Sequence, residues 1–331
     1  MSGISKNGKS SRILTKNKPL VSIVAICYNH SRFLEKTLDS IRNQTYQNLE
    51  VLIIDSFSSD GSFKLIENYV KENDLGTWML HRQERKTSIC ENLNLALSLI
   101  NGEYYQVISC DDIIHPNKIA IQVNELIDRN YESIGLIYSD YSHIDEEGNP
   151  IVEEQFILKK HGFSKLNLPP SGYVFCEILG TWFIHTITCL ISKKAAESIG
   201  GYDENLSYED TDFILRLSKE FKFIAVLNEL AYYRIVSDSL FKTRSIDFYV
   251  STCKLYLKHR GVPVCNSKVK RLISHYYDTL FQMDPYEALK IYLESSSSDF
   301  EFYILWYTNF FRLTGKKEFA LKFKSVLKKL I

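Results

Sequence analysis

Apolar runs alternate with helical patterns along the first 140 residues of the chain. Runs rich in β-branched residues, each running into polar residues, predict buried strands at 20–29, 48–62, 76–82 and 104–112. Between them, apolar residues recur every three or four positions, which predicts helices at 31–44, 62–73, 88–100 and 116–129. Strands that alternate with helices predict an α/β fold with a mainly parallel sheet covered on both faces.

The second half of the chain loses this regular alternation. Its pattern predicts a strand, a short helix, an acidic loop and a helix within 180–221, and then one or two strands within 222–235. Helical spacing dominates the remainder. We therefore expect a disordered basic arm at 1–18, an α/β domain at 19–240 and a helical C-terminal region at 245–331.

The bulk composition excludes several classes of protein. The 331 residues carry 40 basic and 40 acidic side chains, so the zero formal net charge argues against a nucleic-acid binder. No apolar run approaches the ~18 residues of a membrane span, and the N-terminus lacks the apolar core of a signal peptide. The seven cysteines form no CxxC pair, so we expect a reducing, cytoplasmic compartment and no structural disulfide.

The basic segment 312–331 leaves two interpretations open. It holds seven basic residues and one acid, with apolar residues at helical spacing on the other face. Such a helix suits an anionic membrane surface. Alternatively, it packs on its own domain and exposes its lysines to water.

Acidic side chains follow two of the predicted strands. Asp55 ends one apolar run, and the adjacent pair Asp111 and Asp112 ends another. Parallel strands end at one edge of a sheet, where such folds bind ligands, so these carboxylates and the strand-end residues Tyr28 and Asn29 are candidates for a site. Converging carboxylates repel unless a divalent cation or a donor-rich ligand lies between them. Alternatively, the pair caps the following helix and Asp55 begins a turn.

Three further groups of charged or polar residues have a simple structural explanation when each is taken alone. Glu209, Asp210 and Asp212 precede an apolar helix, where the helix dipole alone explains acidic residues. Arg234 ends a strand, and a lone arginine is usually solvated or ion-paired. His185 alternates with apolar residues, which is more typical of a core or groove histidine than of a ligand.

Taken in order, seven segments resemble the inverting family 2 glycosyltransferases with the GT-A fold. The resemblance covers about residues 19–240 and suggests the type that builds bacterial surface polysaccharides. The segments that carry it are VSIVAICYN, DSIRNQTYQNLE, IIDSFSSDGS, ICENLNLALSLINGEY, SCDD, GGYDENLSYEDTD and the YR that ends the last strand. The resemblance implies a nucleotide-sugar half at 19–140 and an acceptor half at 141–240.

The resemblance also implies roles for single residues. Asp210 would be the general base, with Glu209 positioning it or the acceptor, and Asp112 would hold a divalent cation, Mn²⁺ or Mg²⁺. The implied nucleotide-binding residues are Ala25, Tyr28, Asn29, Asp55, Asn94 and Asp111. The candidates for acceptor or diphosphate contacts are Trp182, His185 and Arg234.

Four positions depart from the pattern of this family. Ser109 replaces the first acid of the metal motif, Ser56 replaces a second Asp, Leu93 replaces an Arg, and Val236 replaces a His. These losses support the alternative of a degenerate nucleotide-sugar or glycan-binding protein. The retained acids favour an active enzyme. A nucleotide-binding oxidoreductase is a weaker alternative, because the chain has no glycine-rich phosphate loop.

The predicted activity is therefore sugar transfer with inversion from a nucleotide-diphosphate sugar, with a UDP-sugar favoured. The transferred group would be a hexosyl or N-acetylhexosaminyl unit, and the acceptor a saccharide or a lipid-linked saccharide. We expect a cytoplasmic protein, at the inner face of the cell membrane if segment 312–331 binds lipid.

Overall fold

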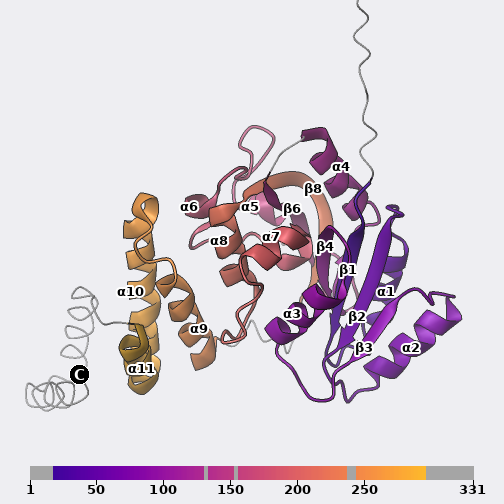
Figure 1. Ribbon diagram of the computed structural model, residues 1–331, viewed down its shortest axis with the longest axis horizontal. Coiled ribbons are helices and arrows are strands. Elements are labelled where there is room, and N and C mark those ends of the chain that lie inside the picture. The colour runs from indigo at the N-terminus through magenta and orange to yellow at the C-terminus, as the bar shows by residue number, and fades with distance from the viewer. Residues whose placement is uncertain (1–17, 130–132, 153–155, 237–243, 296–331) are drawn as a thin grey trace, which may run out of the picture.

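A computed structural model of the chain describes residues 18–129, 133–152, 156–236 and 244–295 (Figure 1). The predicted segment 312–331 and all but the last residue of the predicted basic arm lie outside these residues. Within them no helix is both long and apolar enough to cross a membrane.

One mixed sheet runs through the described α/β region in the order β3-β2-β1-β4-β7-β6-β8-β5. The strands are β1 (Val21–Cys27), β2 (Leu49–Asp55), β3 (Met79–Arg82), β4 (Tyr104–Ser109), β5 (Ile113–Ile114), β6 (Ile134–Ile144), β7 (Leu190–Ser192) and β8 (Lys222–Arg234). Neighbours pair in parallel from β3 to β4 and again between β6 and β8, whereas β7 and β5 pair antiparallel. The predicted α/β fold with a mainly parallel sheet is confirmed.

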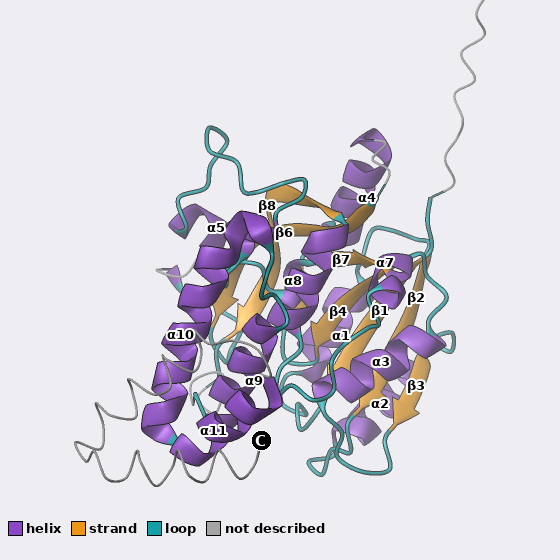
Figure 2. Ribbon diagram, turned by 60° about the vertical axis from the view of Figure 1, so that its left-hand side comes forward, coloured by secondary structure: helices purple, strands orange, loops and turns teal. Residues whose placement is uncertain are grey.

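Helices cover both faces of this sheet (Figure 2). The longer helices are α1 (Leu34–Arg42), α2 (Ser62–Glu72), α3 (Ile89–Leu99), α4 (Lys118–Arg129) and α8 (Asp210–Glu220). Shorter helical segments are α5 (Ile157–Lys160), α6 (Phe175–Ile178), the 3₁₀ turn η2 (Thr186–Thr188) and α7 (Lys193–Ser198). Because helices exclude water from both faces, all seven residues of β1 are buried, which explains why Ser22 is its one polar residue.

Local sequence signals explain where some of these helices begin. Ser88 caps α3: its side chain accepts a hydrogen bond from the backbone of Glu91, whose carboxylate accepts one from the backbone of Ser88. The strand predicted around His185 is mostly absent, however, because the chain turns through η2 before the short β7.

The C-terminal region is helical, as predicted, as far as the structure describes it. It contains α9 (Ile246–Leu257), the 3₁₀ turn η4 (Pro263–Cys265), α10 (Asn266–Met283) and α11 (Pro285–Ser295). These helices pack together on the side of the molecule opposite α1 and α2 (Figure 1).

A disulfide joins this region to the α/β domain and corrects one expectation. Cys176 on α6 is bonded to Cys265 of η4, with the Cα atoms 5.9 Å apart and a sequence separation of 89. The prediction of no structural disulfide is wrong for this pair. Spacing along the chain carries no information about cysteines that only the tertiary fold brings together.

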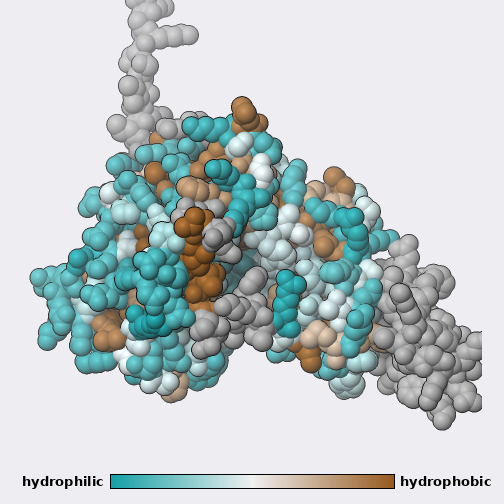
Figure 3. Space-filling model, turned by 180° about the vertical axis from the view of Figure 1, so that it is seen from behind, coloured by the Kyte–Doolittle hydropathy of each residue, from teal (hydrophilic) through white to brown (hydrophobic). Residues whose placement is uncertain are grey.

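The surface is mostly hydrophilic, with one apolar strip. Figure 3 shows hydrophobic side chains gathered in the middle of the face opposite to that of Figure 1, with hydrophilic surface on both sides. Large apolar residues are also exposed between β6 and α6, where Leu166 and Leu168 are 101% and 65% exposed.

Candidate active site

The carboxyl ends of β1, β2 and β4 meet at one edge of the sheet. In the strand register, Cys27 of β1 lies beside Asp55 of β2, and Ile26 lies beside Ser109 of β4. The residues that follow these ends, 28–30 and 110–112, therefore share that edge. Open α/β sheets bind ligands at this edge.

Asp55 is a fully buried carboxylate with one unused oxygen. Its Oδ2 accepts a hydrogen bond from the backbone N–H of Ser58 at 3.0 Å and lies 3.7 Å from Nε of Arg82, at the end of β3. Its Oδ1 is buried and has no hydrogen-bond partner. Since buried polar atoms are rarely left unpaired, Asp55 presents an acceptor suited to an N–H group of a ligand.

Tyr28 and Asn29 follow β1 and form the neighbouring wall. Tyr28 is 37% exposed, and Nζ of Lys86 lies 4.2 Å from the centre of its ring. Asn29 has φ +57°. It holds the loop after β2, because its side-chain Oδ1 accepts a hydrogen bond from the backbone N–H of Ser59 at 2.9 Å. Ala25, by contrast, is fully buried within β1, two residues before the strand end.

The adjacent acids after β4 have different surroundings. Asp112 is 2% exposed, and its Oδ1 accepts a hydrogen bond from the backbone N–H of Arg234 at 2.8 Å. Burial, and then the charge of Asp111, raise the pKa of Asp112 well above its ordinary value. Asp111 has a buried Oδ1 without a partner, and its Oδ2 lies 3.8 Å from Nε2 of His30. Asp111 therefore has a buried carboxylate oxygen left for a ligand.

Arg234 ties the strand-end segment to a distant turn. The side chain is 1% exposed, and its Nε donates to the backbone oxygen of Asp111 at 2.6 Å. Its Nη1 donates to the backbone oxygens of Asp145 and Glu146 at 2.8 and 2.9 Å. These bonds give Arg234 a positioning role. Its buried Nη2 has no hydrogen-bond partner, and the acceptor or diphosphate contact proposed from the sequence stays a prediction.

The second acidic pair lies at the start of α8. Oδ1 of Asp210 accepts a 2.6 Å hydrogen bond from the backbone N–H of Thr211. Burial, and then the neighbouring charge of Asp210, raise the pKa of Glu209 to about 8. A carboxyl group with this pKa is mostly protonated at neutral pH.

His185 lies within electrostatic reach of both acidic pairs. Burial lowers its pKa, while the charges of Asp210 and Asp111 act in the opposite direction. Its ring packs 4.5 Å from that of Tyr233 and 5.8 Å from that of Tyr141, and its Nδ1 has no hydrogen-bond partner. The rings of His185, just before η2, of Tyr141 on β6 and of Tyr233 on β8 thus pack together.

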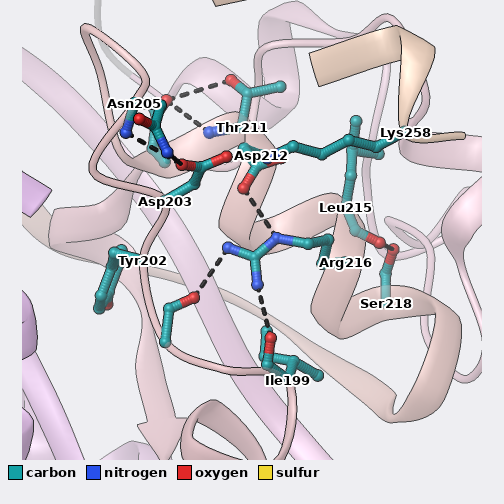
Figure 4. A network of polar contacts seen from close by, with 12 residues as sticks. Ile199, Tyr202, Asp203, Asn205, Thr211, Asp212, Leu215, Arg216, Ser218 and Lys258 are labelled. Carbon is teal, nitrogen blue, oxygen red and sulfur yellow. Dashed lines mark hydrogen bonds and ion pairs between the residues drawn. The ribbon is translucent and has the colours of Figure 1, made fainter. Parts of the chain in front are cut away.

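Asp212, the third acid of its segment, has a structural explanation (Figure 4). It is 1% exposed and lies 2.7 Å from both Nε of Arg216 and Nζ of Lys258, the residue directly after α9. Arg216 also donates to the backbone oxygens of Ile199 and Gly201 at 2.9 and 2.8 Å. This network fixes the loop that leads to Asp210.

Two predicted contacts have other partners. The side-chain amide of Asn94 donates to the backbone oxygen of Tyr202 and the carboxylate of Glu204, and its carbonyl accepts from the backbone N–H of Tyr202. Trp182 packs against Tyr208 and Phe248, at ring distances of 6.3 and 6.1 Å. Both residues thus join segments of the protein, and their predicted ligand contacts stay predictions.

Sequence reasoning missed His30 and Arg82, which the structure brings to Asp111 and Asp55. One signal was available, since His30 directly follows the proposed residues Tyr28 and Asn29. Arg82 ends a strand that the pattern did predict, so the rule used for Asp55 also applies to it.

The described side chains offer a partial cation site. No group of three or more His, Cys, Asp or Glu residues is arranged to hold a metal ion in the described ranges. Magnesium sites, however, often use one or two carboxylates and complete their shell with substrate phosphate oxygens and water. The unpartnered oxygen of Asp111 fits that type of site.

This mixed, mainly parallel sheet, with helices on both faces and acids at the ends of its parallel strands, has the GT-A fold. Residues 22–200 match the family model described as Glycosyl transferase family 2. Because the match covers more than half of the chain, the protein belongs to this family.

Curated relatives agree with this assignment. An uncharacterized glycosyltransferase of Rickettsia typhi, RT0329, is 28% identical over 190 residues, which cover 57% of this chain and 55% of that protein. The chain thus spans about half the length of that relative. The putative teichuronic acid biosynthesis glycosyltransferase TuaG of Bacillus subtilis is 23% identical over 69% of this chain and 83% of its own length.

Solved structures share the fold at low sequence identity. The mannosyltransferase PcManGT of Pyrobaculum calidifontis, in complex with GDP-Man and Mn²⁺, has a TM-score of 0.60 and 15% identity, covering 94% of this chain and 84% of its own. TarS 1–349 of S. aureus, in complex with UDP-GlcNAc, has a TM-score of 0.58 and 15% identity, covering 87% and 79%.

Proposed function

We propose that this protein is a glycosyltransferase that moves a sugar from a nucleotide-diphosphate sugar to a saccharide acceptor with inversion. One observation carries this proposal: Asp55 and Asp111, at one edge of the sheet, each keep a buried carboxylate oxygen without a partner. The base N–H groups of a nucleotide would satisfy Asp55, and the exposed ring of Tyr28 offers the base a surface to stack on.

We favour a UDP-sugar as donor, carrying a hexosyl or N-acetylhexosaminyl group. TarS has been solved with UDP-GlcNAc and with UDP, whereas PcManGT was solved with GDP-Man. These neighbours share only the fold, so their ligands indicate which nucleotides to test first.

The acids on α8 would perform the chemistry at the acceptor. Glu209, whose pKa is raised to about 8, keeps its proton at neutral pH and is a poor base there. Asp210 is bonded to Thr211 at the start of the helix and becomes the anion that takes the proton from the acceptor hydroxyl. A positioned general base typically contributes about 10²–10⁴ in rate, and a single displacement inverts the anomeric centre.

A divalent cation, Mn²⁺ or Mg²⁺, would be held by Asp111. The sequence assigned this role to Asp112, but the bond of Asp112 to Arg234 and its raised pKa favour Asp111 instead. When bound, such a cation stabilises the negative charge that develops on a nucleoside diphosphate leaving group.

The acceptor would be a surface polysaccharide or its lipid-linked precursor, as the name of the relative TuaG suggests. We place the reaction at the inner face of the cell membrane. The helix proposed to bind the membrane, 312–331, lies outside the described residues, so that part of the proposal rests on its amphipathic sequence.

The first experiment is a thermal-shift panel with UDP, GDP, dTDP and CDP, each with and without Mn²⁺. A ligand at 100 times its dissociation constant stabilises the folded state by about 2.7 kcal/mol. We expect UDP with Mn²⁺ to give the largest shift. No shift with any nucleotide would contradict the proposed donor site.

Asp210→Asn then separates transfer from binding. Asparagine retains the acceptor oxygen for the N–H of Thr211 but cannot take a proton, so we expect turnover to fall about 10²–10⁴-fold with UDP affinity within a few-fold. Glu220→Gln, at the exposed far end of the same helix, is the matched control. Near-normal turnover by Asp210→Asn would exclude Asp210 as the base. A wild-type protein that binds UDP but transfers no sugar would favour the binding-protein alternative.

A further inference from the structure

His30 approaches the open carboxylate of the donor site. The chain turns after β1 at Asn29, and the backbone N–H of His30 donates to Oγ of Ser62 at 3.0 Å, which fixes the start of the next segment. Nε2 of His30 then lies 3.8 Å from Oδ2 of Asp111, and the two side chains are only 21% and 19% exposed. We propose that His30 and Asp111 together bind the divalent cation that accompanies the nucleotide.

The distance between the two side chains supports a shared ligand. It exceeds the 2.7–3.2 Å of an N–H···O hydrogen bond, so the two groups do not satisfy each other. Two ligand atoms that each lie ~2.1 Å from one ion are roughly 3–4 Å apart. Each side chain also keeps a buried polar atom without a partner, Nδ1 of His30 and Oδ1 of Asp111.

His30 is the imidazole that lies beside the Asp111 carboxylate in the described residues. Asp112 is bonded to Arg234, Cys110 is buried, and Ser109 offers at most a neutral hydroxyl. The charge of Asp111 acts to raise the pKa of His185, but the His185 ring packs against that of Tyr233. Among the described imidazoles, only that of His30 lies within 4 Å of the Asp111 carboxylate.

An imidazole ligand changes which metal the site prefers. Carboxylate, water and phosphate oxygens suit Mg²⁺, whereas imidazole suits later divalent metals better than it suits Mg²⁺. A site with one carboxylate and one imidazole should therefore bind Mn²⁺ more tightly than Mg²⁺ in the presence of UDP. This inference rests on the proposed nucleotide-sugar site and adds a ligand and a metal preference to it.

The test measures Mn²⁺ binding by electron paramagnetic resonance with saturating UDP, and UDP binding by calorimetry with and without Mn²⁺. The variants are His30→Ala, His30→Asp and Asp111→Asn, with His275→Ala, an exposed histidine on α10, as control. Thermal unfolding confirms that each variant is folded.

We expect His30→Ala to weaken Mn²⁺ binding at least 10-fold and to change metal-free UDP binding less than twofold. His30→Asp should restore cation binding and shift the preference from Mn²⁺ towards Mg²⁺, a change that a merely structural role would not produce.

Three results would overturn the inference. One is unchanged Mn²⁺ affinity in His30→Ala when Asp111→Asn abolishes it. Another is an equal loss of UDP affinity with and without Mn²⁺, which would show that His30 contacts the diphosphate directly. If the wild-type protein binds neither UDP nor any other nucleotide, the proposed function fails as well, so the two failures are distinguishable.

Discussion

The acids at the end of β4 and those at the start of α8 each place two carboxyl groups side by side in the chain, but in different surroundings. Asp112 is buried and bonded to a residue 122 positions away, whereas Asp111 keeps an oxygen open. In the second pair, desolvation and the charge of Asp210 raise the pKa of Glu209 to about 8.

The comparison shows two ways to tolerate adjacent like charges. In the first pair, burial favours the neutral form of Asp112, while the backbone N–H and charge of Arg234 favour its anion. In the second, the neutral form of Glu209 removes most of the repulsion at neutral pH. We propose that the other member of each pair, Asp111 or Asp210, is the carboxylate that acts on the substrates.

The largest expected effect comes from replacing the two acids of the first pair, Asp111 and Asp112, one at a time. Asp111→Asn should abolish the Mn²⁺-dependent stabilisation by UDP and lower transfer roughly 10³-fold, since a metal ion contributes several kcal/mol to stabilising the transition state. Asp112→Asn keeps an oxygen that can accept from Arg234, so its Mn²⁺ affinity should stay within a few-fold. Calorimetry with UDP and Mn²⁺ checks both. If Asp112→Asn lost Mn²⁺ binding and Asp111→Asn kept it, Asp112 would be the metal ligand.

Removing the guanidinium of Arg234, which holds the first acidic pair in place, should destabilise the fold. Arg234→Met leaves the backbone oxygens of Asp111, Asp145 and Glu146 without their donor and weakens the charge balance of Asp112. A buried acceptor that loses its hydrogen-bond donor typically costs about 1–3 kcal/mol. Urea denaturation measures this cost, with Arg271→Met, an exposed arginine on α10, as control. A change below ~1 kcal/mol would contradict the positioning role.

The smallest effect concerns pH and Glu209. Its pKa is raised from an ordinary 4.5 to about 8 in the folded state, so the folded protein binds more protons than the unfolded chain between these values. This group therefore lowers stability progressively as pH rises from about 5 to 8. Glu209→Gln should be more stable relative to wild type at pH 8 than at pH 5. Chemical denaturation of both proteins at pH 5 and pH 8 tests this. An equal difference in unfolding free energy at the two pH values would exclude the raised pKa.

The sequence predicted much of this fold because the features that determine it are local. The apolar runs of β1, β2 and β4 and the helical spacing between them identify a parallel sheet, and its strand ends indicate where Asp55 and Asp111 lie. The resemblance to family 2 added the role of Asp210, which remains a prediction.

Pairings between distant segments could not be predicted in this way. Nothing near Asp112 indicates that it turns inwards towards Arg234, and nothing near Cys176 indicates its bond to Cys265. Similarly, nothing near Asn94 indicates its hydrogen bonds to Tyr202. Each of these depends on how the second half of the chain packs on the first.

The bonds of Arg234 also determine when the donor site can form during synthesis. Asp111 leaves the ribosome more than 120 residues before the arginine that holds its backbone, at roughly 5–20 residues per second. For about 6–25 seconds, the first half of the sheet therefore exists without β8, and β5, which pairs only with β8 in the described sheet, has no partner strand. A nascent chain is thus unable to hold its acids in the arrangement described here until the final strand of the sheet has been made.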